Sequence, residues 1–258
     1  MNLYVLLKMV PDTVEELNVS ADGKSLDAEF LRFKLNDPDE HALEQALLLK
    51  EKHGGRVTVI TLDAPEVDEV LFTALAKGAD RAVKIPISQA GLGTVAAAKV
   101  LADFFAAAPG ALTSDTLLLP GSYAIDDLEG ELAPLLAAAL NLPFIGVVCG
   151  VVVTGDKASV LKEFAGGLRA RFEVPLPAVL GIQSAEKPPR YVPVAKVRAV
   201  MKSAKIEEAD VTPPEKPLQL EIERTYKPEA AGHAEMLEGA HEDVADKLVE
   251  VLAKTGVI

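Results

Sequence analysis

Short apolar runs alternate with helical patterns through the first two-thirds of this 258-residue sequence. The runs, each of which predicts a buried strand, span residues 3–10, 57–62, 82–85 and 116–119. Apolar side chains recur at helical spacing over residues 37–53, 67–77, 94–107 and 126–140. Because the runs lack strict apolar–polar alternation, they are typical of strands that are covered on both faces. We therefore expect an α/β fold with a doubly wound, mostly parallel sheet.

Two of the predicted helices carry capping signals at their starts. In the first, we expect Asp37 at the N-cap, Pro38 at the first helical position and Glu40 three residues after the cap. The last of the four is expected to begin at Asp126, with Glu129 completing a capping box.

The pattern changes after residue 150. Two apolar segments, 151–154 and 157–164, flank the dipeptide Gly155-Asp156, which predicts a hairpin with a two-residue turn. Apolar and polar residues then alternate strictly over 168–174, as in a half-exposed strand, and another strand is expected over 178–182. The parallel body is therefore expected to carry an antiparallel extension.

A different composition begins near residue 211. The proline-rich stretch 212–217 cannot form a helix or a central strand, and an amphipathic helix is predicted over 241–254. We therefore divide the chain into an α/β domain, 1–210, and a C-terminal arm, 211–258, that ends in a helix. Since that helix cannot bury its apolar face alone, it must dock on the body or on another chain.

Charge and cysteine content exclude several classes of protein. Lys and Arg total 26 against 39 Asp and Glu, a net charge of −13 that argues against a nucleic-acid binder. The single cysteine, Cys149, excludes an internal disulfide and a multi-cysteine metal site. No apolar run approaches the ~20 residues that span a bilayer, and the N-terminus has no basic leader, so we expect a cytoplasmic protein.

The loop after the fourth apolar run is the best-placed candidate for a binding site. Ligands of doubly wound sheets bind at the carboxyl ends of strands, and Gly121, Ser122 and Tyr123 suit close backbone approach and hydrogen bonding there. The sequence has no Gly-x-Gly-x-x-Gly motif after a strand. The alternative is that Asp126 only caps the following helix, a role that is compatible with binding.

A cationic strip over residues 187–205 contrasts with the acidic chain. It holds six basic residues and no acidic one, and could steer an acidic partner. The alternative is a solvated loop followed by a basic helix.

Segments spread over nearly the whole chain resemble, in the same order, the beta subunit of electron-transfer flavoproteins. They read LKMVPD (7–12), NDPDEHALEQA (36–46), TALAKGADR (73–81), AIDD (124–127), KEFAGG (162–167), LPAV (176–179), PRY (189–191) and the tail 238–258. The resemblance implies an adenine-nucleotide-binding type of fold and an electron carrier rather than an enzyme. It also implies a heterodimer whose alpha subunit holds most of the redox FAD, with acyl-CoA dehydrogenases as electron donors.

The resemblance also implies site residues by position. A pocket that holds AMP, or a second FAD in bifurcating members, corresponds to Leu6, Asn36, Asp37, Pro38, Asp39, Leu62, Gly121, Ser122, Tyr123, Ala124, Ile125, Asp126, Glu129 and Glu131. The loop expected to face the flavin comprises Pro11, Asp12, Thr13 and Val14. The partner-docking residues correspond to Lys187, Arg190, Tyr191, Val194, Lys196, Arg198 and Lys202.

The pocket sequence departs from the family pattern at residues 128–133. These residues read LEGELA, whereas AMP-binding members resemble DCNQTG, so the amide and hydroxyl that would face a phosphate are replaced. Glu129 and Glu131 add negative charge, which repels phosphate. We therefore expect AMP or a second FAD to bind here weakly or not at all. Residues 9–13 look like bifurcating members and 124–127 like plain carriers, which leaves bifurcation open.

Two other functions remain open from the sequence. A free-standing adenine-nucleotide-binding regulatory module would share the α/β body and pack the arm on that body. An enzyme using Asp126 and Asp127 for metal-assisted chemistry would need further carboxylates or histidines at the same place.

Overall fold

The computed structural model describes residues 1–29, 31–108, 110–127, 130–214, 222–228, 232 and 234–258. The strands among them are β1 (Asn2–Leu7), β2 (Met9–Pro11), β3 (Phe33–Leu35), β4 (Arg56–Asp63), β5 (Arg81–Ser88), β6 (Thr116–Leu119), β7 (Phe144–Thr154), β8 (Lys157–Glu163), β9 (Arg169–Pro175), β10 (Ala178–Ile182) and β11 (Glu207–Glu208). The α-helices are α1 (Asp37–His53), α2 (Val67–Lys77), α3 (Thr94–Ala107), α4 (Leu132–Leu140), α5 (Val194–Ser203) and α6 (His241–Lys254).

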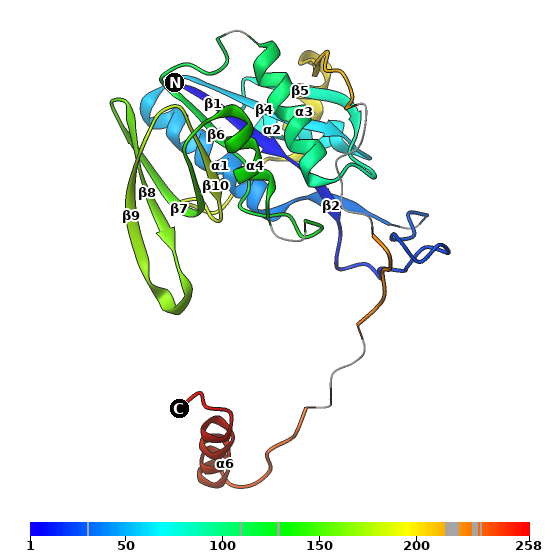
Figure 1. Cartoon of the computed structure of the whole chain (residues 1–258), viewed down its shortest axis with the longest axis vertical. Helices are drawn as coiled ribbons and strands as arrows, with labels where there is room; N and C mark the ends of the chain where they lie inside the picture. Colours follow the sequence, from blue (N-terminus) through cyan, green and yellow to red (C-terminus); the bar gives the residue numbers. More distant parts are fainter. Residues whose placement is uncertain (30, 109, 128–129, 215–221, 229–231, 233) are drawn as a thin grey trace.

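A nine-stranded sheet organises the body of the protein (Figure 1). Its order is β11-β5-β4-β1-β6-β10-β7-β8-β9, and neighbours are parallel from β11 to β7. β7, β8 and β9 pair antiparallel, and β7 and β8 are joined through the predicted turn at Gly155 and Asp156. The predicted fold class, a doubly wound and mostly parallel sheet with an antiparallel extension, is confirmed.

Helices cover both faces of the parallel strands, so the sheet has two apolar cores. Leu3, Val5 and Leu7 of β1 pack in one core with α1 and α2. Leu6 faces the opposite way and packs in the other core with α3 and α4. Because successive strand side chains point to opposite faces, a strand covered on both sides must be apolar at both sets of positions. This explains the unbroken apolar runs.

The first apolar run forms two strands rather than one. β1 pairs with β4 as far as Leu7 and with β6 as far as Val5, whereas β2 leaves the main sheet and pairs antiparallel with β3. Between them, the N–H of Lys8 donates to a carboxylate oxygen of Asp39 at 2.8 Å instead of continuing the sheet. The break therefore depends on a residue 31 positions away, which the apolar pattern could not reveal.

Helix starts differ from two of the predictions. α2, α3 and α6 have the predicted bounds, but the N-cap of α1 is Asn36 and not Asp37. The carbonyl of Asn36 accepts the N–H groups of Asp39 and Glu40, while its side chain makes no cap hydrogen bond.

The start predicted at Asp126 is wrong, because α4 begins at Leu132. Asp126 therefore caps no helix, and its carboxylate accepts a hydrogen bond from Nζ of Lys8 at 2.6 Å. Gly130 has φ +66°, in the left-handed region that favours glycine, and a Cβ there would lie 2.8 Å from the carbonyl oxygen of Ser122. Glu129, the expected capping-box partner, lies outside the described residues, as does Leu128 of the predicted helix face.

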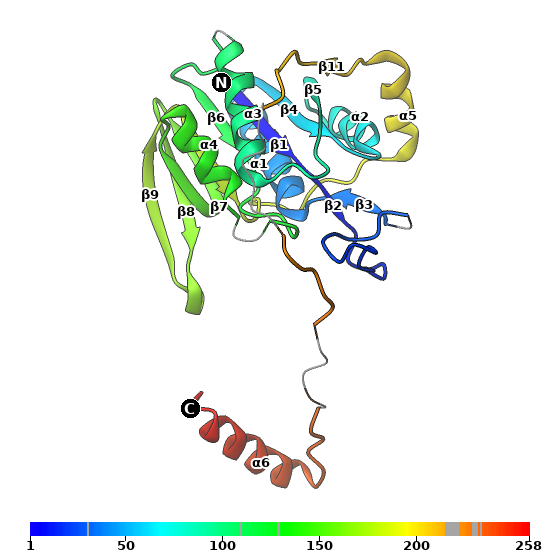
Figure 2. The ribbon, with the colours of Figure 1, turned by 45° about the vertical axis from the view of Figure 1, so that its right-hand side comes forward.

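The described residues of the C-terminal arm lead away from the sheet, and the last of them form α6 (Figures 1 and 2). The described residues between β11 and α6 form no helix or strand, and none of α6 is buried. The N–H of Thr225 donates to the carbonyl of Gly23 at 2.7 Å, and Lys227 forms an ion pair with Glu16 at 3.0 Å. Within the described part of the chain, no helix is both long and apolar enough to cross a bilayer.

The packing of the central sheet predicts which leucine side chains stabilise the protein. Leu119 of β6 is fully buried, so Leu119→Ala should leave a cavity and lower the free energy of unfolding by about 2–5 kcal/mol. Leu168, which is 69% exposed, is a control of the same residue type, and Leu168→Ala should change stability by less than about 0.5 kcal/mol. Urea denaturation measures both, and equal losses would contradict this description of the core.

Candidate functional site

An open pocket, whose empty space of about 690 Å³ includes solvent outside its mouth, lies at the carboxyl ends of β1, β4 and β6. β1 stands between β4 and β6, and the chain builds outward from β1 through β4 and β5 before β6 is added on its other side. This reversal of strand order is the topological switch point at which open α/β sheets bind ligands. The lining residues are Leu6, Leu7, Lys8, Asn36, Asp39, Ile60, Thr61, Leu62, Gln89, Leu92, Thr94, Ala97, Leu101, Pro120, Gly121, Ser122, Tyr123, Ala124, Asp127, Gly130 and Leu132.

The structure gathers eight of the predicted pocket residues around this space. They are Leu6, Asn36, Asp39, Leu62, Gly121, Ser122, Tyr123 and Ala124. The other predicted residues that the structure describes lie outside the lining, namely Asp37, Pro38, Ile125, Asp126 and Glu131. Glu129 belongs to the undescribed residues.

Several lining residues were missed from the sequence. Lys8 and Thr61 lie at the ends of β1 and β4, Gln89 directly follows β5, and Thr94 begins α3. The rule that the carboxyl ends of parallel strands meet at one edge could have indicated the first three. Gln89 donates to the carbonyl of Met9 at 2.6 Å, which ties the loop after β5 to β2.

A buried carboxylate holds three elements together beneath the pocket. Asp39, in the first turn of α1, is 5% exposed and accepts N–H hydrogen bonds from Lys8 at 2.8 Å and from Gly121 at 2.9 Å. Burial raises the pKa of Asp39 to about 7, although hydrogen bonds from Asn36, Lys8 and Gly121 act in the opposite direction. The carboxyl group therefore joins α1 to the ends of β1 and β6.

Glycine at position 121 permits this close approach. A Cβ there would collide with Oδ1 of Asp39 and would lie 2.8 Å from Cβ of Pro38. Its predicted role in close backbone approach is thus explained by a contact within the protein.

The loop after β6 is held by its own polar contacts. The hydroxyl of Ser122 donates to the carbonyl of Gly181 at 2.7 Å and accepts the N–H of Val147 at 3.1 Å. The amide of Asn36 donates to the carbonyl of Tyr123 at 2.8 Å. Asp127 accepts a hydrogen bond from the hydroxyl of Thr94 at 2.9 Å. The loop is therefore positioned before any ligand arrives.

These contacts allow a test of whether an adenine nucleotide fits. Leu6, Leu62 and Leu101 supply an apolar surface on which a flat ring could lie. The cation that could face a phosphate, Lys8, is instead 2.6 Å from Asp126. Asp127 adds another carboxylate to the lining. The described residues therefore fit an uncharged ring better than a phosphate group.

The described residues contain no group of three or more His, Cys, Asp or Glu side chains placed to hold a metal ion.

Of the loop expected to face the flavin, Thr13 and Val14 are exposed, whereas Pro11 is a buried residue at the end of β2. The N–H of Asp12 donates to the carbonyl of Arg32 at 2.9 Å, and its carboxylate accepts the N–H of Val14 at 3.1 Å. The side chain of Val14 is 90% exposed. Pro11 and Thr13 complete this loop, which presents an apolar side chain to solvent.

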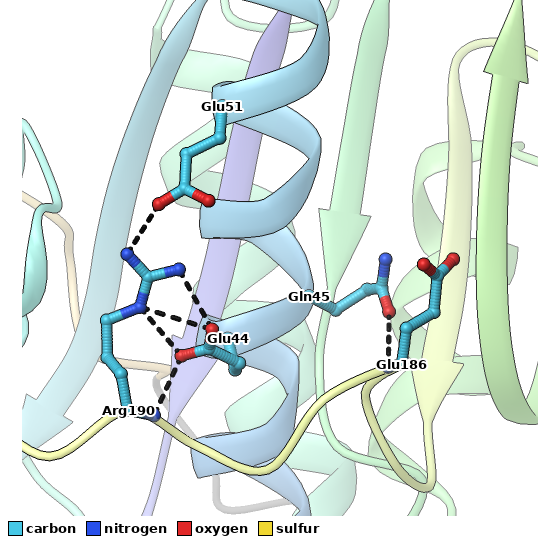
Figure 3. A network of polar contacts seen from close by, with 5 residues as sticks. All are labelled: Glu44, Gln45, Glu51, Glu186 and Arg190. Atoms are coloured by element: carbon cyan, nitrogen blue, oxygen red, sulfur yellow. Dashed lines mark hydrogen bonds and ion pairs between the residues drawn. The ribbon is translucent and has the colours of Figure 1, made fainter.

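The cationic strip comprises an extended segment and helix α5, which has no buried residue. Tyr191 and Val194 are 84% and 60% exposed, and the side chains of Lys187, Lys196, Arg198 and Lys202 are also on the surface. Arg190 differs, because its guanidinium forms ion pairs with Glu44 at 2.8 Å and Glu51 at 2.6 Å (Figure 3). The solvated basic surface is therefore mainly α5.

The family model "Electron transfer flavoprotein domain" matches residues 27–214. The chain is 30% identical to an electron transfer flavoprotein subunit beta of Bacillus subtilis, covering 98% of this chain and 97% of the relative. It is 34% identical to the subunit of the same name in Clostridium acetobutylicum, over 76% and 74% of the two chains. It is 27% identical, over the full length of both chains, to the acryloyl-CoA reductase electron transfer subunit gamma of Anaerotignum propionicum.

The buried carboxyl group predicts an unusual dependence of stability on pH. Because the pKa of Asp39 is raised from 3.8 to about 7, the folded protein keeps this proton between pH 4 and 7 when the unfolded chain has lost it. The contribution of Asp39 to the free energy of unfolding should therefore fall by up to about 4 kcal/mol as pH rises through this range, and stay constant above it.

Urea denaturation of the wild-type chain and of Asp39→Asn between pH 4 and 8 measures this contribution as a difference. Asp37→Asn is the matched control, since Asp37 is exposed and pairs only at the surface with Lys34. Its stability should follow that of the wild type at each pH. Parallel curves for the wild type and Asp39→Asn would show that the pKa of Asp39 is not raised.

Proposed function

This chain belongs to the electron transfer flavoprotein family, in which its relatives from Bacillus subtilis and Clostridium acetobutylicum are beta subunits, and we propose that it forms a heterodimer with an alpha subunit that binds most of the FAD. Electron transfer is the activity of the family. The FAD would supply the redox chemistry, and this chain would shape its surroundings, hold the alpha subunit and present a docking surface. Such a carrier needs no acid, base or nucleophile from this subunit. The same proposal includes a cytoplasmic location.

The C-terminal arm carries this proposal. On α6, Leu248, Val249 and Val251 are 49%, 53% and 41% exposed, although an amphipathic helix is stable only when its apolar side is covered. The described arm residues that contact the body are Val211, which packs on a core of the sheet, and residues near Thr225 and Lys227, all well before α6. We therefore propose that α6, and with it the domain 211–258, binds the alpha subunit. A free-standing nucleotide-binding module, the alternative, would need the helix to pack on its own body.

The docking surface that we propose is α5 with Tyr191 and Val194. An exposed aliphatic residue within a cationic surface suits a partner that has an apolar pocket with an acidic rim. The printed name of the Anaerotignum propionicum relative joins an electron transfer subunit to an acryloyl-CoA reductase. We extend this association to propose an acyl-CoA dehydrogenase, or a similar flavin dehydrogenase, as the redox partner. The loop 11–14 is proposed to approach the flavin.

For the pocket at the switch point, we propose that neither AMP nor a second FAD binds tightly. The ion pair between Lys8 and Asp126 and the carboxylate of Asp127 support this, because they leave little favourable charge for a phosphate.

Covering of α6 by the alpha subunit makes a direct prediction. Replacing Leu248 and Val251 together by Glu should prevent assembly, because charged groups would have to enter an apolar contact. Co-expression with the alpha subunit, followed by affinity purification and a visible spectrum, measures this. The wild type should yield a yellow heterodimer, and the double variant a chain without alpha subunit.

Glu250→Gln, on the same exposed helix, should still assemble. A wild-type chain that purifies alone and colourless in the presence of the alpha subunit would contradict the proposed function.

Nucleotide content tests the pocket separately. Acid release of bound cofactors from the purified heterodimer, followed by chromatography, should give one FAD per dimer and AMP far below one equivalent. Stoichiometric AMP, or two FAD per dimer, would show that the pocket binds a nucleotide tightly despite its acidic side chains. Either result would leave the heterodimer itself unaffected.

A further inference from the structure

The segment between β10 and α5 crosses the outer face of α1, where side chains of the helix accept its backbone N–H groups (Figure 3). The N–H of Ala185 donates to Nδ1 of His41 at 3.2 Å, and the N–H of Glu186 to Oε1 of Gln45 at 3.2 Å. Residues 41, 44 and 45 lie on one side of the helix because they are three and four positions apart. The side chains of the helix thus fix the path of the segment by accepting its backbone N–H groups, as the carbonyl groups of a neighbouring strand would.

The strongest contact joins Glu44 to Arg190. The backbone N–H of Arg190 donates to Oε2 of Glu44 at 2.9 Å, and its guanidinium donates to the same carboxylate through Nε at 2.9 Å and Nη2 at 2.8 Å. Nη1 donates to Glu51 at 2.6 Å. Such a fork of charged hydrogen bonds fixes orientation as well as distance.

Among the ion pairs of the described residues, this one has the most deeply buried carboxylate. Glu44 is only 3% exposed, and glutamate is rarely buried without a partner. Burial by itself raises the pKa of the Glu44 carboxyl, but the hydrogen bonds from Arg190 outweigh it and leave the pKa below its ordinary value. Loss of Arg190 would leave a buried charge unpaired, whereas loss of the exposed Glu51 would not.

The far end of the same segment is also fixed. After α5, β11 pairs with β5, and Glu207 accepts two hydrogen bonds from Arg81, at 2.9 and 2.6 Å. Between these two attachments, α5 lies against α2, although none of its residues is fully buried. Val194 begins α5 four positions after Arg190. The orientation of α5 therefore depends on its two ends as well as on its contact with α2.

We propose that Glu44 and Arg190 are positioning residues that hold α5 ready to dock the redox partner. Arg190 then acts by facing inward to α1 and not by contacting the partner. A segment that is already ordered loses less conformational entropy on binding, so it binds more tightly. The inference rests on the proposed docking role of α5, and its test separates the two.

The test uses the heterodimer of the full chain with the alpha subunit, checked for flavin content by its visible spectrum. Glu44→Gln keeps the side-chain volume but removes the charge and places an NH₂ group among donors. Arg190→Lys keeps the charge and the backbone N–H but loses the fork. Glu51→Gln is the matched control, because it makes the same change in the 57%-exposed partner of the same guanidinium.

Two quantities are measured for each variant. Amide hydrogen exchange at Ala185, Glu186 and Arg190 reports the order of the segment. The rate of flavin reduction by a substrate-reduced acyl-CoA dehydrogenase, followed against heterodimer concentration, gives KM and the limiting rate. Glu44→Gln should speed exchange and raise KM about tenfold with a limiting rate within about twofold of wild type. Arg190→Lys should give exchange rates and a KM between those of the wild type and Glu44→Gln. Glu51→Gln should stay within about twofold of the wild type in both quantities.

The charge reversal Lys196→Glu with Arg198→Glu tests the docking surface itself. If it raises KM but Glu44→Gln does not, the positioning role is overturned and the docking surface stands. If Glu44→Gln leaves amide exchange unchanged, the positioning role is likewise wrong. If the charge reversal leaves KM unchanged, α5 is not the docking surface and the inference falls with it. If Glu44→Gln only damaged the structure, it would lower the flavin content or the limiting rate. Such an effect without a change in KM would also overturn the positioning role.

Discussion

The buried carboxyl group of Asp39 connects the parts of the fold from which the pocket is made. It accepts N–H groups from Lys8 at the end of β1 and from Gly121 at the end of β6, and it stands in the first turn of α1. A buried carboxyl oxygen without donors would be costly, so the ends of both strands are required to stay close to the helix. The break between β1 and β2, the glycine at 121 and the position of the loop after β6 all follow from this one group.

Helix α1 contacts three parts of the protein: the sheet, the pocket and the segment 185–190. Its apolar side, with Ala42, Leu43 and Leu47, packs on the sheet. Its N-terminal turn supports the pocket through Asp39, and its outer side holds the segment 185–190 through Glu44. The candidate cofactor pocket and the proposed docking surface are therefore attached to the same rigid element, at different places on it. Because α1 is rigid, it keeps a partner that is docked on α5 at a constant distance from the pocket.

Local patterns were reliable where one short stretch carries the whole signal. The bounds of α2, α3 and α6, the hairpin turn at Gly155 and Asp156, and the strands β6 and β10 all agree with the sequence-based expectations. The start of α4 did not, because apolar spacing continues back toward Asp126 while Gly130 adopts a left-handed conformation outside the helix. An aspartate before apolar residues is a capping signal only if no stronger partner competes, and here Lys8 binds its carboxylate.

The fold class could be predicted from the amino-acid pattern alone, because apolar periodicity is a local property that decides which faces each strand and helix must bury. The sequence also indicated the family, and with it eight of the residues that line the pocket. The folded arrangement was needed to find that Lys8 meets Asp126, that Gly121 meets Asp39 and that Arg190 faces Glu44, which is 146 residues away in the chain. The physical reason is that a charged side chain carries no local sign of its partner. A cationic residue can be solvated or can pair with a buried acid, depending on which residues the fold brings next to it. Arg190 pairs with the buried Glu44.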